Sequence, residues 1–169
     1  CHPRLDNPGA AAPVEKSSLV SVLIVSIDAL HPDALSRTHS PHIHSLMEKG
    51  VFTLKGQSTA PPLTLLSHAA MFTGIGPGQG GRADNFWQPG EKTVSGTTLF
   101  TDAKSRGFAT GFFYAKKKLG YLTSADVDTY QLDRDFTAEL AESFFKTKDP
   151  KKFCFLHISG LDRVGPIEG

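Results

Sequence analysis

The sequence has few cysteines, no long apolar run and no excess of one charge. Its longest apolar stretch, 19–27, is interrupted by serines and is far shorter than the ~20 residues that a membrane-spanning helix requires. The 18 Lys and Arg residues nearly balance the 17 Asp and Glu residues, so the net charge of +1 predicts no binding to nucleic-acid polymers or to an acidic membrane. Two cysteines are too few for a disulfide framework or a zinc finger.

The two cysteines have different interpretations. Cys154 lies in the apolar run 153–156 and is predicted to be a buried, unreactive thiol. Cys1 precedes a polar segment rich in Pro, Ala, Gly and Ser, which is typical of a processed lipoprotein with a lipidated cysteine and a flexible tether. The alternative is that position 1 is an arbitrary boundary. On the first interpretation, residues 1–18 are a tether that anchors an exported domain, 19–169, to a membrane.

The remaining composition, 39% hydrophobic and 21% charged, is that of an ordinary globular domain. Apolar runs typical of strands alternate with segments of helical periodicity. The predicted strands are 19–27, 51–55, 108–114 and 153–159, and the predicted helices are 41–49, 64–73, 98–106 and 136–147. This alternation predicts an α/β fold with a mostly parallel sheet and helices on both faces.

Two predicted strands run directly into a carboxylate. Asp28 follows the first strand, and Asp162 follows the last. Ligands bind beyond the carboxyl ends of parallel strands, and Asp oxygens there are good ligands for a divalent cation. The alternative is that each carboxylate caps the helix or turn that follows it.

Thr64 begins a predicted helix behind a Pro-Pro turn, where unpaired N–H groups attract phosphate. A metal at Asp28 would activate its hydroxyl as a nucleophile, whereas the simpler interpretation is a helix-capping threonine. A serine hydrolase is excluded because Ser67 and His68 are sequence neighbours on one helix and lack the G-x-S-x-G turn. His68 is therefore expected to be packed or hydrogen-bonded one turn beyond Thr64.

Three other groups of residues give weaker signals. His42 and His44 diverge on a helix, so they are predicted to be surface residues and not metal ligands. The basic triplet 116–118 is predicted to be a solvated corner without a role. Phe86 and Trp87 lie in the long loop 74–96, where they either wall a substrate pocket or pack onto the sheet.

Three segments together, 24–30, 40–51 and 61–74, resemble the alkaline phosphatase superfamily, and within it the type I phosphodiesterase and nucleotide pyrophosphatase branch. The resemblance implies an alkaline-phosphatase-like fold and two divalent metal ions, with zinc the favoured identity. It implies that Asp28 is a metal ligand and that Thr64 is the metal-bound nucleophile. By the same resemblance, Asn85 hydrogen-bonds a phosphoryl oxygen and Asp162 binds the second metal.

The sequence also departs from the family pattern. Pro166 stands where the family has a metal-binding histidine, and the family's further Asp-His pair and late histidine are not in the sequence. We therefore expect the chain to be the N-terminal part of a larger catalytic domain, incomplete as it stands, or a degenerate relative. The formylglycine motif of sulfatases is absent, and Leu65 replaces the aromatic residue that many nucleotide-cleaving members have beside the nucleophile.

The resemblance implies a metal-dependent hydrolase of small phosphate esters, either phosphodiesters or pyrophosphates, that forms a covalent phospho-threonine. The alternatives are a non-catalytic member and a phosphomutase on the same scaffold. Residues 1–169 alone are expected to bind zinc weakly and to be inactive, because at least three protein ligands are usual for a zinc site. The expected location is an exported, zinc-accessible compartment such as a periplasm. The sequence predicts no particular oligomeric state.

Overall fold

The computed structural model describes residues 19–162. Within this range a four-stranded parallel sheet has the strand order β1-β4-β2-β3. The strands are β1 (Val20–Ile27), β2 (Ala109–Tyr114), β3 (Thr129–Leu132) and β4 (Lys151–Ile158). The predicted tether with Cys1, and Pro166, lie outside the described residues.

β4 occupies the interior of the sheet, between β1 and β2. Six of its eight residues are buried, as expected for a parallel strand covered on both faces. Successive side chains point to opposite faces, so Phe155 lies in one hydrophobic cluster while Cys154 and Leu156 lie in the other. The apolar run of β4 thus supplies both cores at once.

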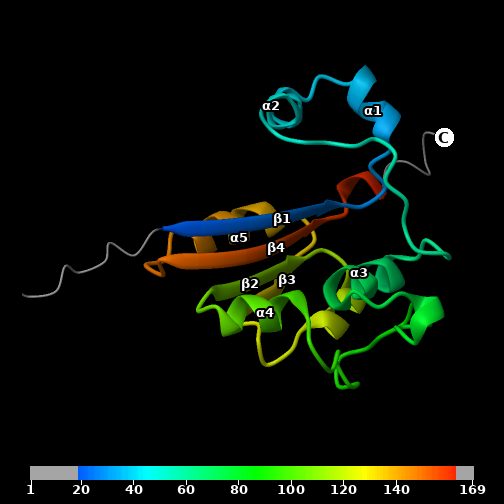
Figure 1. Ribbon diagram of the computed structural model, residues 1–169, viewed down its shortest axis with the longest axis vertical. Coiled ribbons are helices and arrows are strands. Elements are labelled where there is room, and N and C mark those ends of the chain that lie inside the picture. The colour runs from blue at the N-terminus through cyan, green and yellow to red at the C-terminus, as the bar shows by residue number, and fades with distance from the viewer. Residues whose placement is uncertain (1–18, 163–169) are drawn as a thin grey trace, which may run out of the picture.

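Helices cover both faces of the sheet (Figure 1). On one face lie α3 (Thr64–Thr73) and α4 (Leu99–Ser105), and on the other lies α5 (Thr137–Phe145). The predicted α/β fold, a mostly parallel sheet with helices on both faces, is therefore confirmed. No helix among residues 19–162 is both long enough and apolar enough to cross a bilayer.

Aromatic rings hold α3 against the sheet. Phe72 of α3 is 1% exposed, and its ring centroid lies 5.2 Å from Phe100, 5.4 Å from Phe112 and 4.6 Å from Phe155. Each such pair contributes ~0.5–1.5 kcal/mol beyond the burial of its apolar area. The helix that begins with Thr64 is consequently fixed on the sheet along its buried side.

Several local predictions are confirmed. α3 has the predicted bounds, and it ends at Gly74, which adopts the left-handed conformation with φ 73°. α2 (Pro41–Lys49) also has its predicted bounds. The predicted surface position is confirmed for His42, which is exposed, whereas His44 is half-buried and its Nε2 donates to the Leu35 carbonyl of α1 (Pro32–Arg37).

The predicted strand at 51–55 is wrong, because this segment has no strand partner in residues 19–162 and is irregular. Its apolar side chains Val51 and Phe52 are exposed. The sequence prediction also missed α1, β3 and two short 3-10 helices, η1 (Pro77–Gln79) and η2 (Lys117–Leu122). All four residues of β3 are exposed, and their sequence has no apolar run. The prediction missed this strand because it relied on such runs.

Candidate active site

The candidate site lies at the carboxyl ends of β1 and β4. The two strands pair in parallel with Ile27 opposite Ile158, and the Asp28 N–H donates to the Ile158 carbonyl at 2.9 Å. Ala29 then adopts a left-handed conformation, φ 61°, that turns the chain away from the sheet. Asp162 lies four residues beyond the end of β4, so both predicted carboxylates reach the same edge of the sheet.

A lysine side chain joins the predicted residues. Lys116 Nζ lies 2.5 Å from Asp28 Oδ2 and 2.8 Å from Asp162 Oδ2. It also donates to Thr64 Oγ1 at 3.3 Å. The structure thus brings Asp28, Asp162 and Thr64 around one positive charge.

The interpretation of the basic triplet as a solvated corner is wrong for Lys116. Lys116 follows β2, whose carboxyl end lies at the same edge as those of β1 and β4. The rule that singled out the aspartates, a polar residue soon after the end of a parallel strand, therefore applies to this lysine as well. Its role was missed because lysines on a turn after a strand are usually solvated, and the sequence alone does not place Asp28 and Asp162 beside this one.

The charges at this edge stabilise one another. The neighbouring His157 and Lys116 hold the pKa of the Asp28 carboxyl well below its usual range, against the opposing effect of partial burial. Partial burial works against the charge of Lys116, but the hydrogen bonds to Asp162 and Asp28 outweigh it and raise the lysine pKa. Both groups are therefore charged at neutral pH.

Two buried histidines, His68 and His157, lie next to Thr64 and Asp28. The carbonyl of Thr64 accepts a hydrogen bond from His68 Nδ1 at 2.7 Å, so His68 Nε2 accepts from Ser26 Oγ at 2.9 Å. Burial lowers the pKa of His68 and favours this neutral form. The prediction that His68 is packed and hydrogen-bonded is confirmed, and it links β1 to the first turn of α3.

His157 of β4 is fully buried beside Asp28. Its Nδ1 accepts from the Ala115 N–H at 3.3 Å, which leaves the proton on Nε2. Nε2 lies 3.6 Å from Asp28 Oδ2, slightly longer than a hydrogen bond. In this tautomer the Nε2 proton lies on the side of Asp28 and favours the charged carboxylate, which contributes to the lowered pKa of Asp28.

Thr64 and Asn85 meet at the start of α3. Leu63 occupies the N-cap position and Thr64 is the first helical residue, so its hydroxyl is not used for capping. Asn85 Oδ1 accepts from the Leu65 N–H at 2.9 Å. This bond fixes the Asn85 amide beside the start of α3 and leaves its amino group available as a donor.

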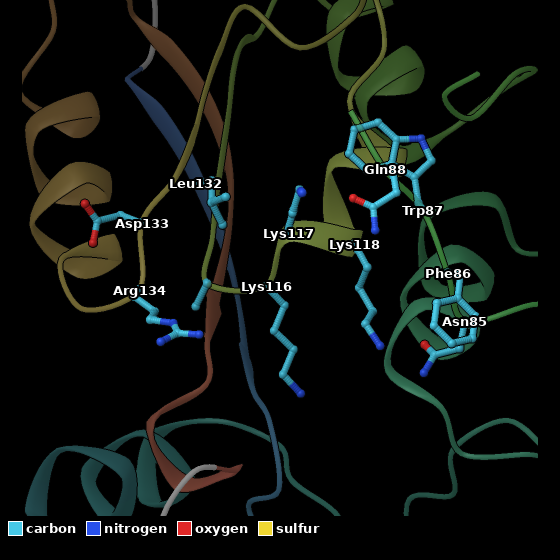
Figure 2. A pocket seen from close by; sticks show the side chains of 11 residues that line it. Asn85, Phe86, Trp87, Gln88, Lys116, Lys117, Lys118, Leu132, Asp133 and Arg134 are labelled. Atoms are coloured by element: carbon cyan, nitrogen blue, oxygen red, sulfur yellow. The ribbon is translucent and has the colours of Figure 1, made fainter. Parts of the chain in front are cut away.

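A cavity of about 630 Å³ opens beside these residues (Figure 2). One wall carries Phe86 and Trp87 from the long loop. Trp87 packs on Gly120 of η2 so closely that a Cβ there would lie 2.4 Å from the indole ring. Trp87 therefore packs on η2 and also lines the cavity, whereas Phe86 lines it while 79% exposed.

The donor types here fit one divalent cation at the position of the lysine ammonium. Two carboxylates and a hydroxyl already surround a positive charge there. Their number does not fit a two-metal centre, because the described residues contain no group of three or more His, Cys, Asp or Glu side chains able to hold a metal. Asp28, Asp162 and Thr64 are thus an incomplete ligand set for the two ions that the resemblance implies.

Comparisons with known proteins agree on the scaffold. The profile described as type I phosphodiesterase / nucleotide pyrophosphatase matches residues 22–166. Murine ectonucleotide pyrophosphatase / phosphodiesterase 5 has a TM-score of 0.63 at 20% identity, covering 85% of this chain and 44% of that chain. An inactive form of the murine protein in complex with AMP gives 0.61 at 19% identity, covering 86% and 45%.

A more distant structural neighbour is the C-terminal periplasmic domain of EcEptC from Escherichia coli. Its TM-score is 0.56 at 11% identity, and the match covers 86% of this chain and 45% of that chain. The comparison with curated protein sequences gives no significant match. This chain spans less than half the length of each of these structures. At these identities the structural likeness shows the shared α/β scaffold, and the profile match shows the family: the chain belongs to the type I phosphodiesterase / nucleotide pyrophosphatase family.

Proposed function

We propose that the full-length protein is a metal-dependent hydrolase of phosphate esters, either phosphodiesters or pyrophosphates, with Thr64 as its covalent nucleophile. The observation that carries the proposal is the arrangement of two carboxylates and the Thr64 hydroxyl around one positive charge. This arrangement lies at the carboxyl edge of a parallel sheet, where such folds bind their ligands.

In the proposed reaction Thr64 Oγ1 attacks the phosphorus of the ester and its proton passes to solvent. The bond from phosphorus to the leaving oxygen breaks, and that oxygen departs with the bonding electrons and takes a proton from water. A water molecule then attacks the phospho-threonine, the bond from phosphorus to Oγ1 breaks, and Thr64 regains a proton.

The residues around Thr64 have separate roles in this proposal. The Asn85 amino group and the free N–H groups at the start of α3 donate to the phosphoryl oxygens as negative charge develops. Asp28 and Asp162 would hold a divalent cation, which supplies positive charge that stabilises the Thr64 alkoxide. Asp162 and the two-zinc centre implied by the resemblance need ligands beyond the described residues.

Substitution of the nucleophile tests this proposal. Thr64→Ala in the full-length protein should lower turnover of an aryl phosphodiester by at least about a thousand-fold, because no other hydroxyl replaces Oγ1. Ser67→Ala, on the same helix, is the matched control and should retain activity, since Ser67 bonds Ser58 and Thr59 and not the site. Activity of Thr64→Ala within a few fold of wild type would refute the assignment.

A second candidate is a non-catalytic member of the family, and the position of Lys116 favours it. An ammonium group already neutralises Asp28 and Asp162. Zinc titration of the full-length protein by calorimetry distinguishes the two candidates, because the hydrolase should bind two zinc ions tightly and the non-catalytic member should not. For residues 1–169 alone we expect weak binding and no turnover, whereas two sites tighter than micromolar would show that other residues complete the centre.

The proposed setting is an exported protein that acts on a small phosphate ester. The E. coli neighbour is itself a periplasmic domain, and the murine neighbour has been captured with AMP. A lipid on Cys1 would anchor the domain to a membrane through a tether at 1–18. Mass spectrometry of the native N-terminus tests this, and an unmodified peptide extending upstream of Cys1 would exclude the anchor.

A further inference from the structure

We propose that the cavity beside Thr64 is a subsite for a second anionic group of the substrate, bound between Lys118 and Arg134. The preferred esters would then carry a carboxylate or a phosphate on the organic group attached to the scissile phosphate. This inference rests on the proposed function, because it places the scissile phosphate at Thr64.

Strand pairing brings the basic residues to one cavity. β2 and β3 pair in parallel with Tyr114 opposite Leu132. The segments that follow these two strands therefore begin side by side, at the same edge of the sheet. Residues 132–134 and 85–88 line opposite sides of the cavity, and residues 116–118 lie between them. Figure 2 shows Lys116 and Lys118 extending in the same direction, with the Arg134 guanidinium turned toward Lys116 and Lys117 pointing the other way.

The charges in the cavity are unequal. Lys116 is paired with Asp28 and Asp162, so it contributes little net charge. Among residues 19–162, neither Lys118 nor Arg134 forms an ion pair. Two positive charges are therefore available to a ligand.

Among the described residues that line the cavity, Asp133 is the one acidic residue, and it offsets these charges only in part. Asp133 Oδ1 accepts the N–H groups of Asp135 and Phe136, each at 3.0 Å, before the start of α5. These hydrogen bonds lower the pKa of Asp133, so the carboxylate keeps its negative charge at neutral pH. Because Lys118 and Arg134 outnumber this one carboxylate, the cavity keeps an excess of positive charge.

The dimensions and the remaining walls suit an organic anion. A volume of about 630 Å³ is within the ~300–1,000 Å³ range of small-molecule sites. Asn85 lines the cavity on the side of Thr64, and Phe86 and Trp87 add apolar surface. A ligand with its phosphate at Thr64 can thus place a carbon framework against the aromatic wall and an oxyanion between Lys118 and Arg134.

A matched set of esters tests the subsite in the full-length protein. The set is 4-nitrophenyl phenyl phosphate and its analogues with a carboxylate or a phosphonate on the phenyl ring. We expect wild type to have a higher kcat/KM for both charged esters than for the uncharged one. The two charged analogues show which oxyanion is preferred, and raised ionic strength should reduce the preference.

Charge-removing variants assign the preference to residues. Lys118→Met and Arg134→Met should each lower the charged-to-uncharged ratio of kcat/KM by about three- to ten-fold, the effect of one partly solvated charge-assisted hydrogen bond. Arg134→Lys should restore part of the ratio, and Lys148→Met, at an exposed lysine that does not line the cavity, should leave it unchanged. An unchanged ratio in both Met variants, or no preference in wild type, would overturn the proposal.

A binding measurement separates failure of the subsite from failure of the proposed function. Thr64→Ala binds the intact esters without cleaving them if the nucleophile assignment is correct. Calorimetry on this variant should show tighter binding of the charged esters, and the added Lys118→Met change should reduce the difference. Esters that stay uncleaved by wild type would refute the proposed function, while equal binding of charged and uncharged esters would refute the subsite.

Discussion

Replacing Lys116 by methionine removes the positive charge shared by Asp28, Asp162 and Thr64. Both carboxylates lie within hydrogen-bond distance of the same Nζ, so they are no more than about 5 Å apart. Two unit charges at that separation repel by about 3 kcal/mol at an effective dielectric constant of ~20. The side chains of Asp28 and Asp162 are 19% and 42% exposed, so solvent screening reduces the expected loss of unfolding free energy to roughly 1–2 kcal/mol.

Urea unfolding of Lys116→Met and wild type in a chelator measures this loss, with Lys117→Met as the control. Added zinc should stabilise Lys116→Met more than wild type, because a divalent cation replaces the missing charge without competing with the ammonium. Equal stability of the two proteins in chelator would show that Lys116 does not hold the carboxylates together. A larger zinc effect on wild type would show that the lysine helps to bind metal.

Three further results are expected. The pKa of Asp28 is lower in the folded protein than its ordinary value of ~3.9, so the stabilisation it gives is complete above about pH 3.9 and is lost as the pH falls toward the folded pKa. Because Lys116 contributes to this lowering, the urea midpoint of Lys116→Met should depend less on pH below ~4 than that of wild type. Gly120→Ala should cost about 1–3 kcal/mol in urea unfolding, and the emission of Trp87, the one tryptophan, should shift as the indole is displaced; an unshifted spectrum would contradict the packing. Burial raises the pKa of Cys154 to about 12, so peptide mapping after iodoacetamide at pH 8 should find it alkylated in urea but not in native protein.

The sequence predicted the parts of the fold that carry strong periodic signals. β4 and α3 were predicted because an apolar run and a helical stripe ending at Gly74 are local patterns that tertiary contacts then reinforce. The segment 51–55 has the composition of a strand but no neighbour to pair with among the described residues. Pairing is a property of the whole sheet and cannot be read from one segment.

The candidate site was predicted unevenly for a similar reason. Asp28, Thr64 and Asp162 were found because each lies at the end or start of a recognisable element. The charge that joins them comes from Lys116, and its role depends on the strand order that places β2 beside β4. Arg134 was missed because β3 was missed, since without that strand there was no reason to place residue 134 at the same edge.

The hydrogen bonds of His68 show that Thr64, the proposed nucleophile, is held by other residues than those that line the cavity. Ser26, His68 and the Thr64 carbonyl tie α3 to β1 through buried atoms. The cavity walls come instead from the surface segments 85–88, 116–118 and 132–134. If the proposed function is correct, substitutions in these segments change which ester is accepted while Thr64 keeps its position, so substrate preference can diverge between relatives without any change in how Thr64 is held.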